Sequence, residues 1–118
     1  MRVLIADDQK GVGATLADLV RACAHEVVEV VGSGFDAIHA YQKHHPDVVL
    51  MDYYMPRLNG ATACRNILAR DATARIVLVS GARDEGYGCG AVAVLPKPVD
   101  LSRLNELLNE TASLNFSK

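Results

Sequence analysis

The chain reads VVLMDYYMP over residues 48–56, and its apolar run ends at Asp52. A run this short that is apolar at every position is typical of a strand covered on both faces. Longer segments with apolar side chains at helical spacing alternate with such runs along the chain. This alternation predicts an α/β fold, a doubly wound five-stranded parallel sheet with helices on both faces. The predicted strands cover residues 2–6, 27–31, 48–51, 76–79 and 91–95.

Several local patterns indicate where helices begin and end. Asn59 and Asp100 stand where helix-capping side chains are expected. The pair His44 and His45 is predicted to end a helix rather than to bind a metal ion. Residues 32–34, Gly-Ser-Gly, are predicted to form a plain turn between a strand and a helix. They lack the further glycine and the Lys-Ser/Thr pair of a phosphate-binding loop.

Composition limits the possible classes of protein. The length of 118 residues suits one domain over residues 1–118, with a frayed tail expected at 112–118. A net charge of -2 with scattered basic residues argues against direct DNA binding. No apolar run reaches the ~18 residues of a membrane helix, so no membrane contact is expected. Cys23, Cys64 and Cys89 have no paired spacing, which predicts reduced thiols and a cytoplasmic location.

Polar side chains follow four of the predicted strands. Asp7 and Asp8 follow the first strand, Asp52 follows the third and Ser80 follows the fourth. Lys97 comes just after the fifth strand. Ligands of open α/β sheets bind outside the carboxyl ends of the strands, so we expect these side chains to converge. The sequence thus predicts three carboxylates, one hydroxyl and one ammonium group at one edge of the sheet.

Phosphoryl chemistry suits this set of groups. Crowded carboxylates repel one another, and their protonation is coupled. A hard divalent cation relieves the repulsion, and Mg²⁺ suits a site built from one or two carboxylates and a substrate phosphate. An aspartate in such a site can attack phosphorus and form an acyl phosphate. Lys97 would supply positive charge and the Ser80 hydroxyl a hydrogen bond to the transferring oxygens.

The order and placement of these residues resemble the signature of response-regulator receiver domains, the CheY-like proteins of two-component signalling. The resemblance covers residues 2–108. It implies a flavodoxin-like strand order, 2-1-3-4-5, and a phosphorelay function. Each motif is weak alone, and their combination at the strand ends is specific. The motifs are Asp7-Asp8, Met51-Asp52-Tyr53-Tyr54-Met55-Pro56 followed by Asn59-Gly60, Ser80-Gly81-Ala82 and Lys97-Pro98.

The resemblance implies a role for each acidic residue. Asp52 would be the phosphoacceptor and one of the metal ligands. Asp8 would bind Mg²⁺ directly, and Asp7 would act on the metal through water. The backbone carbonyl of Tyr54 would complete the protein ligands.

The resemblance also implies how the chain works as a switch. Ser80 would bind the phosphoryl group and reorient on activation, and Lys97 would pair with that group. The Lys97–Pro98 peptide is cis in most of the family. The chain would catalyse its own phosphorylation and slow dephosphorylation without being a conventional enzyme. A sensor histidine kinase or a histidine phosphotransfer protein would be the donor. With no output domain expected in this chain, signalling would go through a downstream protein.

Two features depart from the family pattern. Residues 86–90 are Gly-Tyr-Gly-Cys-Gly, in the short stretch between Ser80 and Lys97 that must hold a helix and a strand. Glycine disfavours helix, so we predict a fourth helix that is short or absent. Val94 stands where many receivers carry an aromatic ring, so the usual hydroxyl–aromatic coupling lacks its ring. Tyr87 could substitute for that ring, although simple packing over the loop is favoured.

Two alternative functions belong to other classes. A receiver-like fold could bind partners without being phosphorylated, but the complete acidic set with Ser80 and Lys97 argues against this. An aspartate-nucleophile phosphatase would carry Asp-x-Asp after the first strand. This chain carries Asp7-Asp8-Gln9 there, which disfavours that reading.

Overall fold

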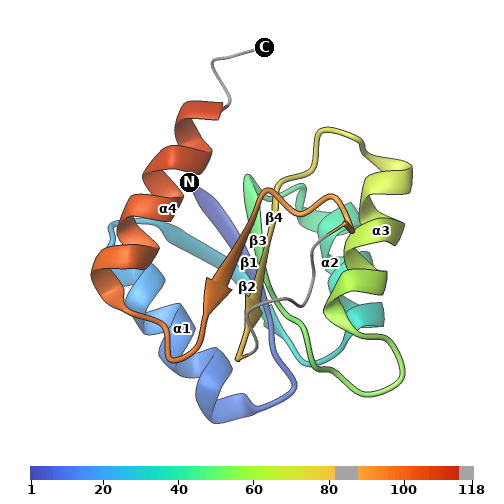
Figure 1. Ribbon diagram of the computed structural model, residues 1–118, viewed down its shortest axis with the longest axis horizontal. Helices are drawn as coiled ribbons and strands as arrows, with labels where there is room; N and C mark the ends of the chain where they lie inside the picture. Colours follow the sequence, from blue (N-terminus) through green and yellow to red (C-terminus); the bar gives the residue numbers. More distant parts are fainter. Residues whose placement is uncertain (82–87, 115–118) are drawn as a thin grey trace.

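The predicted strands form one parallel sheet in the order β2-β1-β3-β4-β5, which confirms the predicted topology (Figure 1). Every neighbouring pair of strands is parallel. The computed structural model describes residues 1–81 and 88–114. The strands are β1 (Arg2–Ala6), β2 (Glu26–Val31), β3 (Val48–Asp52), β4 (Ile76–Ser80) and β5 (Ala93–Pro96).

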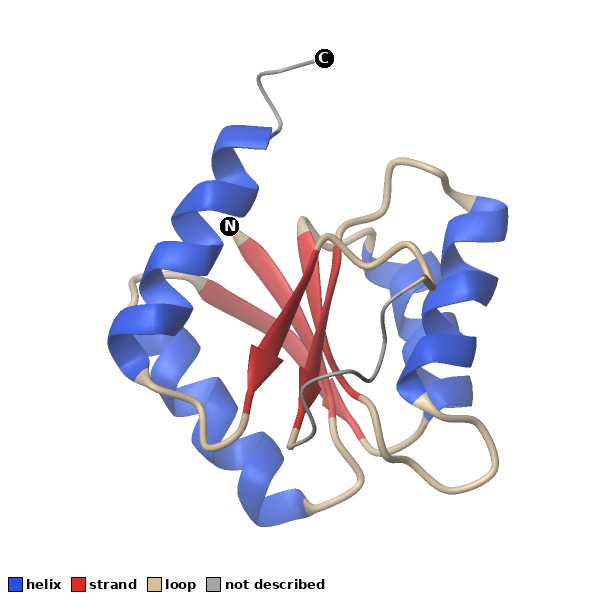
Figure 2. Ribbon diagram, in the orientation of Figure 1, coloured by secondary structure: helices blue, strands red, loops and turns tan. Residues whose placement is uncertain are grey.

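Helices cover both faces of the sheet (Figure 2). On one face α1 packs beside α4, and on the other α2 packs beside α3. None of the helices within the described residues is both long and apolar enough to span a membrane. The helices are α1 (Lys10–Ala22), α2 (Gly34–His44), α3 (Gly60–Arg70) and α4 (Leu101–Leu114).

The central strands are buried at every position of β3 and β4, as their unbroken apolar sequence predicts. Successive side chains of a strand point to opposite faces. Leu4 and Leu78 therefore pack toward α2 and α3, whereas Ile5 and Val77 pack toward α1 and α4. Burying one large aliphatic side chain contributes about 1.5–3 kcal/mol. The two layers thus hold the strands rigidly, and the strands set the positions of the residues at their carboxyl ends.

Side chains cap three of the helices. Ser33 caps α2 by accepting a hydrogen bond from the Asp36 amide at 3.0 Å, so residues 32–34 form the predicted turn. Asn59 caps α3 and Asp100 caps α4 in the same way, as predicted. His45 ends α2 in the left-handed conformation, with φ 45°.

The connection between β4 and β5 departs from the regular alternation of strand and helix. Its described residues, Gly81 and 88–92, are not helical. This agrees with the predicted shortening or loss of the fourth helix of the family. Residues 82–87, with Tyr87 and the predictions made for it, lie outside the described residues.

Two element ends differ from the prediction by more than a single residue. β5 begins at Ala93 rather than at residue 91, because the chain is still turning onto the sheet there. α4 continues through residues 112–114, which were expected to belong to a tail. The extra turn is anchored by Thr111, which is 2% exposed and donates its hydroxyl to the Leu107 carbonyl at 2.8 Å.

Candidate phosphoryl-transfer site

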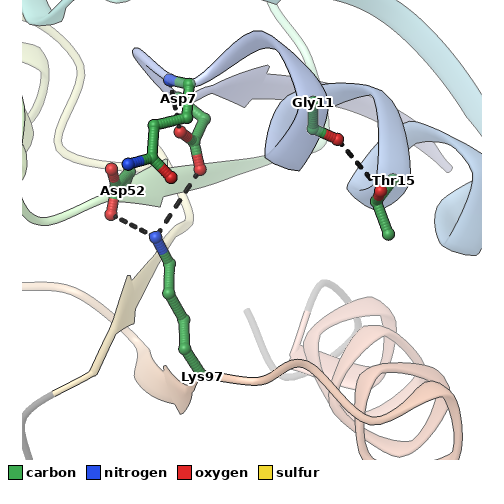
Figure 3. Close-up of polar contacts among 6 residues, drawn as sticks. Asp7, Gly11, Thr15, Asp52 and Lys97 are labelled. Atoms are coloured by element: carbon green, nitrogen blue, oxygen red, sulfur yellow. Dashed lines mark hydrogen bonds and ion pairs between the residues drawn. The ribbon is translucent and has the colours of Figure 1, made fainter.

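The carboxyl ends of β1, β3, β4 and β5 lie at one edge of the sheet, because all of these strands are parallel neighbours. Asp52 is the last residue of β3 and Ser80 the last of β4. Asp7 follows β1 directly, and Lys97 follows β5. In Figure 3 the Lys97 side chain extends to both Asp7 and Asp52. The predicted convergence of these side chains is therefore present.

Three carboxylates form an acidic cluster. One oxygen atom each of Asp7, Asp8 and Asp52 lies within 4.8 Å of the other two. Asp7 is 3% exposed and Asp52 is 4% exposed, whereas Asp8 is open to solvent. Two carboxylates of the cluster are thus buried, and the third is in contact with solvent.

Lys97 is the cation of the site. Its ammonium donates to Asp52 Oδ1 at 3.0 Å and lies 3.7 Å from Asp7 Oδ2. Its backbone amide donates to the Ser80 carbonyl at 2.9 Å, which ties the residue after β5 to the end of β4. The Lys97–Pro98 peptide is cis, as expected. Lys97 is thus held from both ends, by the sheet and by the carboxylates.

The pKa values show how the charges compete. Burial raises the pKa of Asp52, the hydrogen bond from Lys97 opposes this, and the charges of Asp7 and Asp8 add to the rise. Burial acts to lower the pKa of Lys97, but its hydrogen bond to Asp52 and the nearby negative charges outweigh burial and raise it. Lys97 is therefore kept charged, while Asp52 is destabilised as an anion. The site is short of positive charge.

One oxygen of Asp7 indicates what the site could bind. Asp7 Oδ1 accepts a hydrogen bond from the Gln9 amide at 2.9 Å. Asp7 Oδ2 is buried and has no hydrogen-bond partner among the described residues. A buried carboxylate oxygen left without a partner costs free energy. A hard cation, or a water molecule on that cation, would satisfy it, so the donor set fits Mg²⁺.

Ser80 and Tyr54 flank the cluster differently. Ser80 is 1% exposed and follows Val79, the residue of β4 that pairs with Asp52 in β3. The Tyr54 side chain is 60% exposed, and its ring meets that of Tyr53 edge-on. The expected metal ligand at this position is the backbone carbonyl, so an exposed ring is compatible with that role.

Gly60 has a positioning role that the motif alone did not show. Its amide donates to the Tyr53 carbonyl at 2.7 Å. A Cβ atom at this position would overlap the Asp52 carbonyl oxygen. Only glycine therefore allows the first turn of α3 to lie directly against the backbone of the central aspartate. Asn59 predicted where α3 begins, but no pattern in the sequence showed that this helix start would lie against Asp52.

Comparison with known proteins gives the family. The family model of the response regulator receiver domain matches residues 3–109. The chemotaxis protein CheY of Bacillus subtilis is 33% identical, over 93% of this chain and 96% of its own length. CheY of Thermotoga maritima is also 33% identical, over 94% of this chain and 97% of its own.

Solved structures agree with the sequence comparison. A receiver domain protein from Clostridium thermocellum superposes with a TM-score of 0.88 at 22% identity, covering 97% of this chain and 95% of that one. The complex of CheX with CheY, beryllofluoride and magnesium from Borrelia burgdorferi also gives a TM-score of 0.88, at 25% identity, covering 93% of this chain and 87% of that one. The chain belongs to the response regulator receiver domain family.

Proposed function

We propose that this receiver domain accepts a phosphoryl group on Asp52 in the presence of Mg²⁺ and signals through another protein. The observation that supports this most directly is the arrangement of three carboxylates around a single ammonium. Asp7, Asp8 and Asp52 offer oxygens within 4.8 Å of one another, and Lys97 lies 3.0 Å from Asp52 Oδ1. This set leaves two negative charges that a divalent cation would balance.

Asp52 is the proposed nucleophile because it is both buried and central. Its carboxylate oxygen would attack phosphorus, forming a P–O bond to Asp52. The P–N bond to the donor histidine would break, and its electron pair would leave with the imidazole. Lys97 would turn from the carboxylate toward the new phosphoryl oxygens, and Ser80 would donate its hydroxyl to them. Both side chains are already held at the site by their strands.

Mg²⁺ would be held by Asp8 and Asp52, by Asp7 through water, and by the Tyr54 carbonyl. Its charge would neutralise the carboxylates and the transferring oxygens. Asp7 Oδ2 has no hydrogen bond among the described residues, which supports an indirect contact of this kind, since a water molecule on the cation would donate to it.

The partners follow from the chemistry of the donor. A protein phosphohistidine carries the P–N bond that Asp52 would exchange for an acyl phosphate, so a histidine kinase or histidine phosphotransfer protein is the proposed donor. CheX, which is bound to CheY in the Borrelia burgdorferi complex, is an example of a protein that receivers engage. The number and spacing of the three cysteines favour a reducing compartment, and we place the chain in the cytoplasm.

Mass spectrometry after incubation with a small phosphodonor and Mg²⁺ tests this proposal. The wild type should gain about 80 Da, in an adduct that base and hydroxylamine remove, as expected of an acyl phosphate. Asp52→Asn should gain nothing. Asp18→Asn is the matched control, because Asp18 is solvent-exposed and paired with Arg21; it should react like the wild type. An adduct that persists in Asp52→Asn would assign the phosphoryl group to another residue.

A further inference from the structure

Cys89 fastens the connection between β4 and β5 to the body of the protein. Gly88 and Gly90 are exposed, whereas Cys89 between them is only 5% exposed. Both glycines have positive φ, 89° and 96°, a conformation that other residues rarely adopt. The backbone thus turns on either side of Cys89 in a way that directs this one side chain inward.

The element that lies against Cys89 is α3. Cys64 of α3 is completely buried, and its thiol lies 3.7 Å from the Cys89 carbonyl oxygen, within hydrogen-bonding reach. One turn further along α3, Leu68 lies so close that a Cβ on Gly90 would be 2.6 Å from its Cδ1. Cys64 and Leu68 are four residues apart and share one face of the helix. The connection therefore rests on α3 where the fourth helix of the family is reduced.

The Cys64 thiol meets the Cys89 carbonyl and also interacts with the Cys89 side chain. Burial raises the pKa of Cys64 to about 12, and interaction with Cys89 adds to the rise. The thiol of Cys64 is therefore protonated at neutral pH. Cys89 is 5% exposed and Cys64 is completely buried, so Cys89 is the member of the pair that a small molecule reaches first.

Cys23 differs from Cys64 and Cys89 in its position and in its exposure. It follows α1, packs on the other face of the sheet and is partly exposed. The sheet therefore separates it from Cys64 and Cys89, which both belong to the cluster of α2 and α3. A bond between two cysteines of the folded chain is thus possible for one pair only among the three.

We propose that Cys64 and Cys89 form an oxidisable thiol pair, which hydrogen peroxide converts into a disulfide that locks the β4–β5 connection onto α3. The glycines on either side of Cys89 supply the backbone freedom that disulfide geometry demands. No fourth-helix hydrogen bonds have to break in the described part of the connection, because residues 88–92 are not helical.

The chemistry proceeds in two balanced steps. The Cys89 thiolate attacks one peroxide oxygen, the O–O bond breaks, and the sulfenic acid forms as hydroxide leaves and takes up a proton to become water. The Cys64 sulfur then attacks the sulfenic sulfur, forming the S–S bond and breaking the S–O bond. The departing hydroxide takes the Cys64 proton and leaves as a second water. Both thiols are oxidised, and peroxide is the two-electron oxidant.

The consequence for signalling rests on the proposed function. The connection begins directly after Ser80, the residue that would contact the phosphoryl group. We infer that a rearrangement at Ser80 would shift this connection relative to α3. A bond between Cys89 and Cys64 would prevent that movement, so oxidation would uncouple phosphorylation from its readout.

Peptide mapping of the folded protein after peroxide treatment tests the thiol pair without any phosphodonor. The wild type should lose about 2 Da, the two hydrogens of the thiols, and yield one peptide pair linked through Cys64 and Cys89. Cys23→Ala is the matched control and should form the same link. Cys89→Ala should not form the link, and this variant is expected to fold because the residue lies on a loop. Cys64→Ala is a second variant that should not form the link.

The outcomes separate the two proposals. A native wild type in which Cys23 is oxidised while Cys64 and Cys89 stay unlinked would overturn the thiol pair, as would a link through Cys23 or a link seen only in denaturant. If Asp52 proved not to be the phosphoacceptor, the disulfide would still be expected to form.

Hydrogen exchange tests the consequence for signalling. The exchange rates of residues 88–92 should change on adding Mg²⁺ and beryllofluoride to the reduced protein, and should no longer change after oxidation. An equal response in both forms would contradict the lock.

Discussion

At the scale of single residues, the site is governed by an imbalance of charge. Asp7 and Asp52 are buried, Asp8 joins them from the surface, and Lys97 is the one cation paired with the cluster in the described part of the chain. Taking carboxylates out of water is costly unless each is paired and hydrogen-bonded. One ammonium cannot satisfy three carboxylates, and Asp7 Oδ2 remains without a hydrogen bond among the described residues. This imbalance of charge supports the proposal that the site binds a divalent cation.

Asp8→Ala should weaken Mg²⁺ binding with little effect on folding. Asp8 is exposed, so its loss should change stability by less than about 0.5 kcal/mol. Loss of a direct ligand should reduce Mg²⁺ affinity at least about 10-fold, since even residues behind the ligands have effects of that size. Titration calorimetry with Mg²⁺ in the presence of beryllofluoride measures this. Asp18→Ala, exposed on α1, should bind like the wild type. Unchanged affinity in Asp8→Ala would remove Asp8 from the ligand set.

The sequence predicted the positions of those site residues that depend on the strands alone. Asp52 and Ser80 lie at strand ends because the apolar runs stop there, and such runs can be recognised in the sequence. The contact of Gly60 with the Asp52 backbone was not readable, because it depends on how closely α3 approaches β3. The burial of Cys89 was likewise hidden, since its segment has no periodic pattern.

At the scale of elements, a partly buried hydrogen bond joins α2 to the end of α3. Tyr41 of α2 is 6% exposed, and its hydroxyl donates to Asp71 Oδ2, just after α3, at 2.7 Å. Hydrogen bonds from Thr73, and then the one from Tyr41, lower the pKa of Asp71. The first turn of α3 lies against the backbone of Asp52. This bond therefore helps to keep the scaffold of the site in place.

Tyr41→Phe should destabilise the fold by about 1 kcal/mol at neutral pH, the usual contribution of one such hydrogen bond. Because the folded pKa of Asp71 is lowered, its stabilising effect is present above its unfolded pKa of about 3.9 and is lost as pH falls through the folded value. The difference between variant and wild type should therefore shrink below about pH 4. Urea unfolding at pH 7 and at pH 3–4 measures it. In an Asp71→Asn background the pH dependence should disappear; a difference that stays constant with pH would contradict the assignment.

Element ends were harder to predict than the elements themselves. Pro96 closes β5 at the edge of the sheet, where a residue without an amide hydrogen is tolerated, and no local signal distinguished it from a loop proline. α1 begins after Gln9, which makes no capping hydrogen bond through its side chain, so the usual start signal is missing. Tertiary contacts decide both ends, and single-sequence patterns do not contain them.

At the scale of the whole molecule, the stability and the chemistry lie in different places. Two apolar layers on the faces of the sheet stabilise the fold. The acidic cluster lies at the edge of the sheet and works against stability, because burial raises the pKa of Asp52. A ligand that neutralises the cluster binds the folded state and not the unfolded chain, so it should raise the stability of the entire domain.

Thermal unfolding with Mg²⁺ and beryllofluoride tests this coupling between site and fold. At ligand concentrations about 100-fold above the dissociation constant, binding adds about 2.7 kcal/mol to the free energy of unfolding. For a domain of this size that corresponds to a rise in Tm of about 10 °C. Asp52→Asn should lose most of the rise, because an amide offers beryllofluoride no carboxylate oxygen. Asp18→Asn should keep it, since its side chain is 81% exposed and pairs only with Arg21 among the described residues. An equal rise in Asp52→Asn would place the bound ligand away from the acidic cluster and would separate the stability of this fold from the chemistry at its edge.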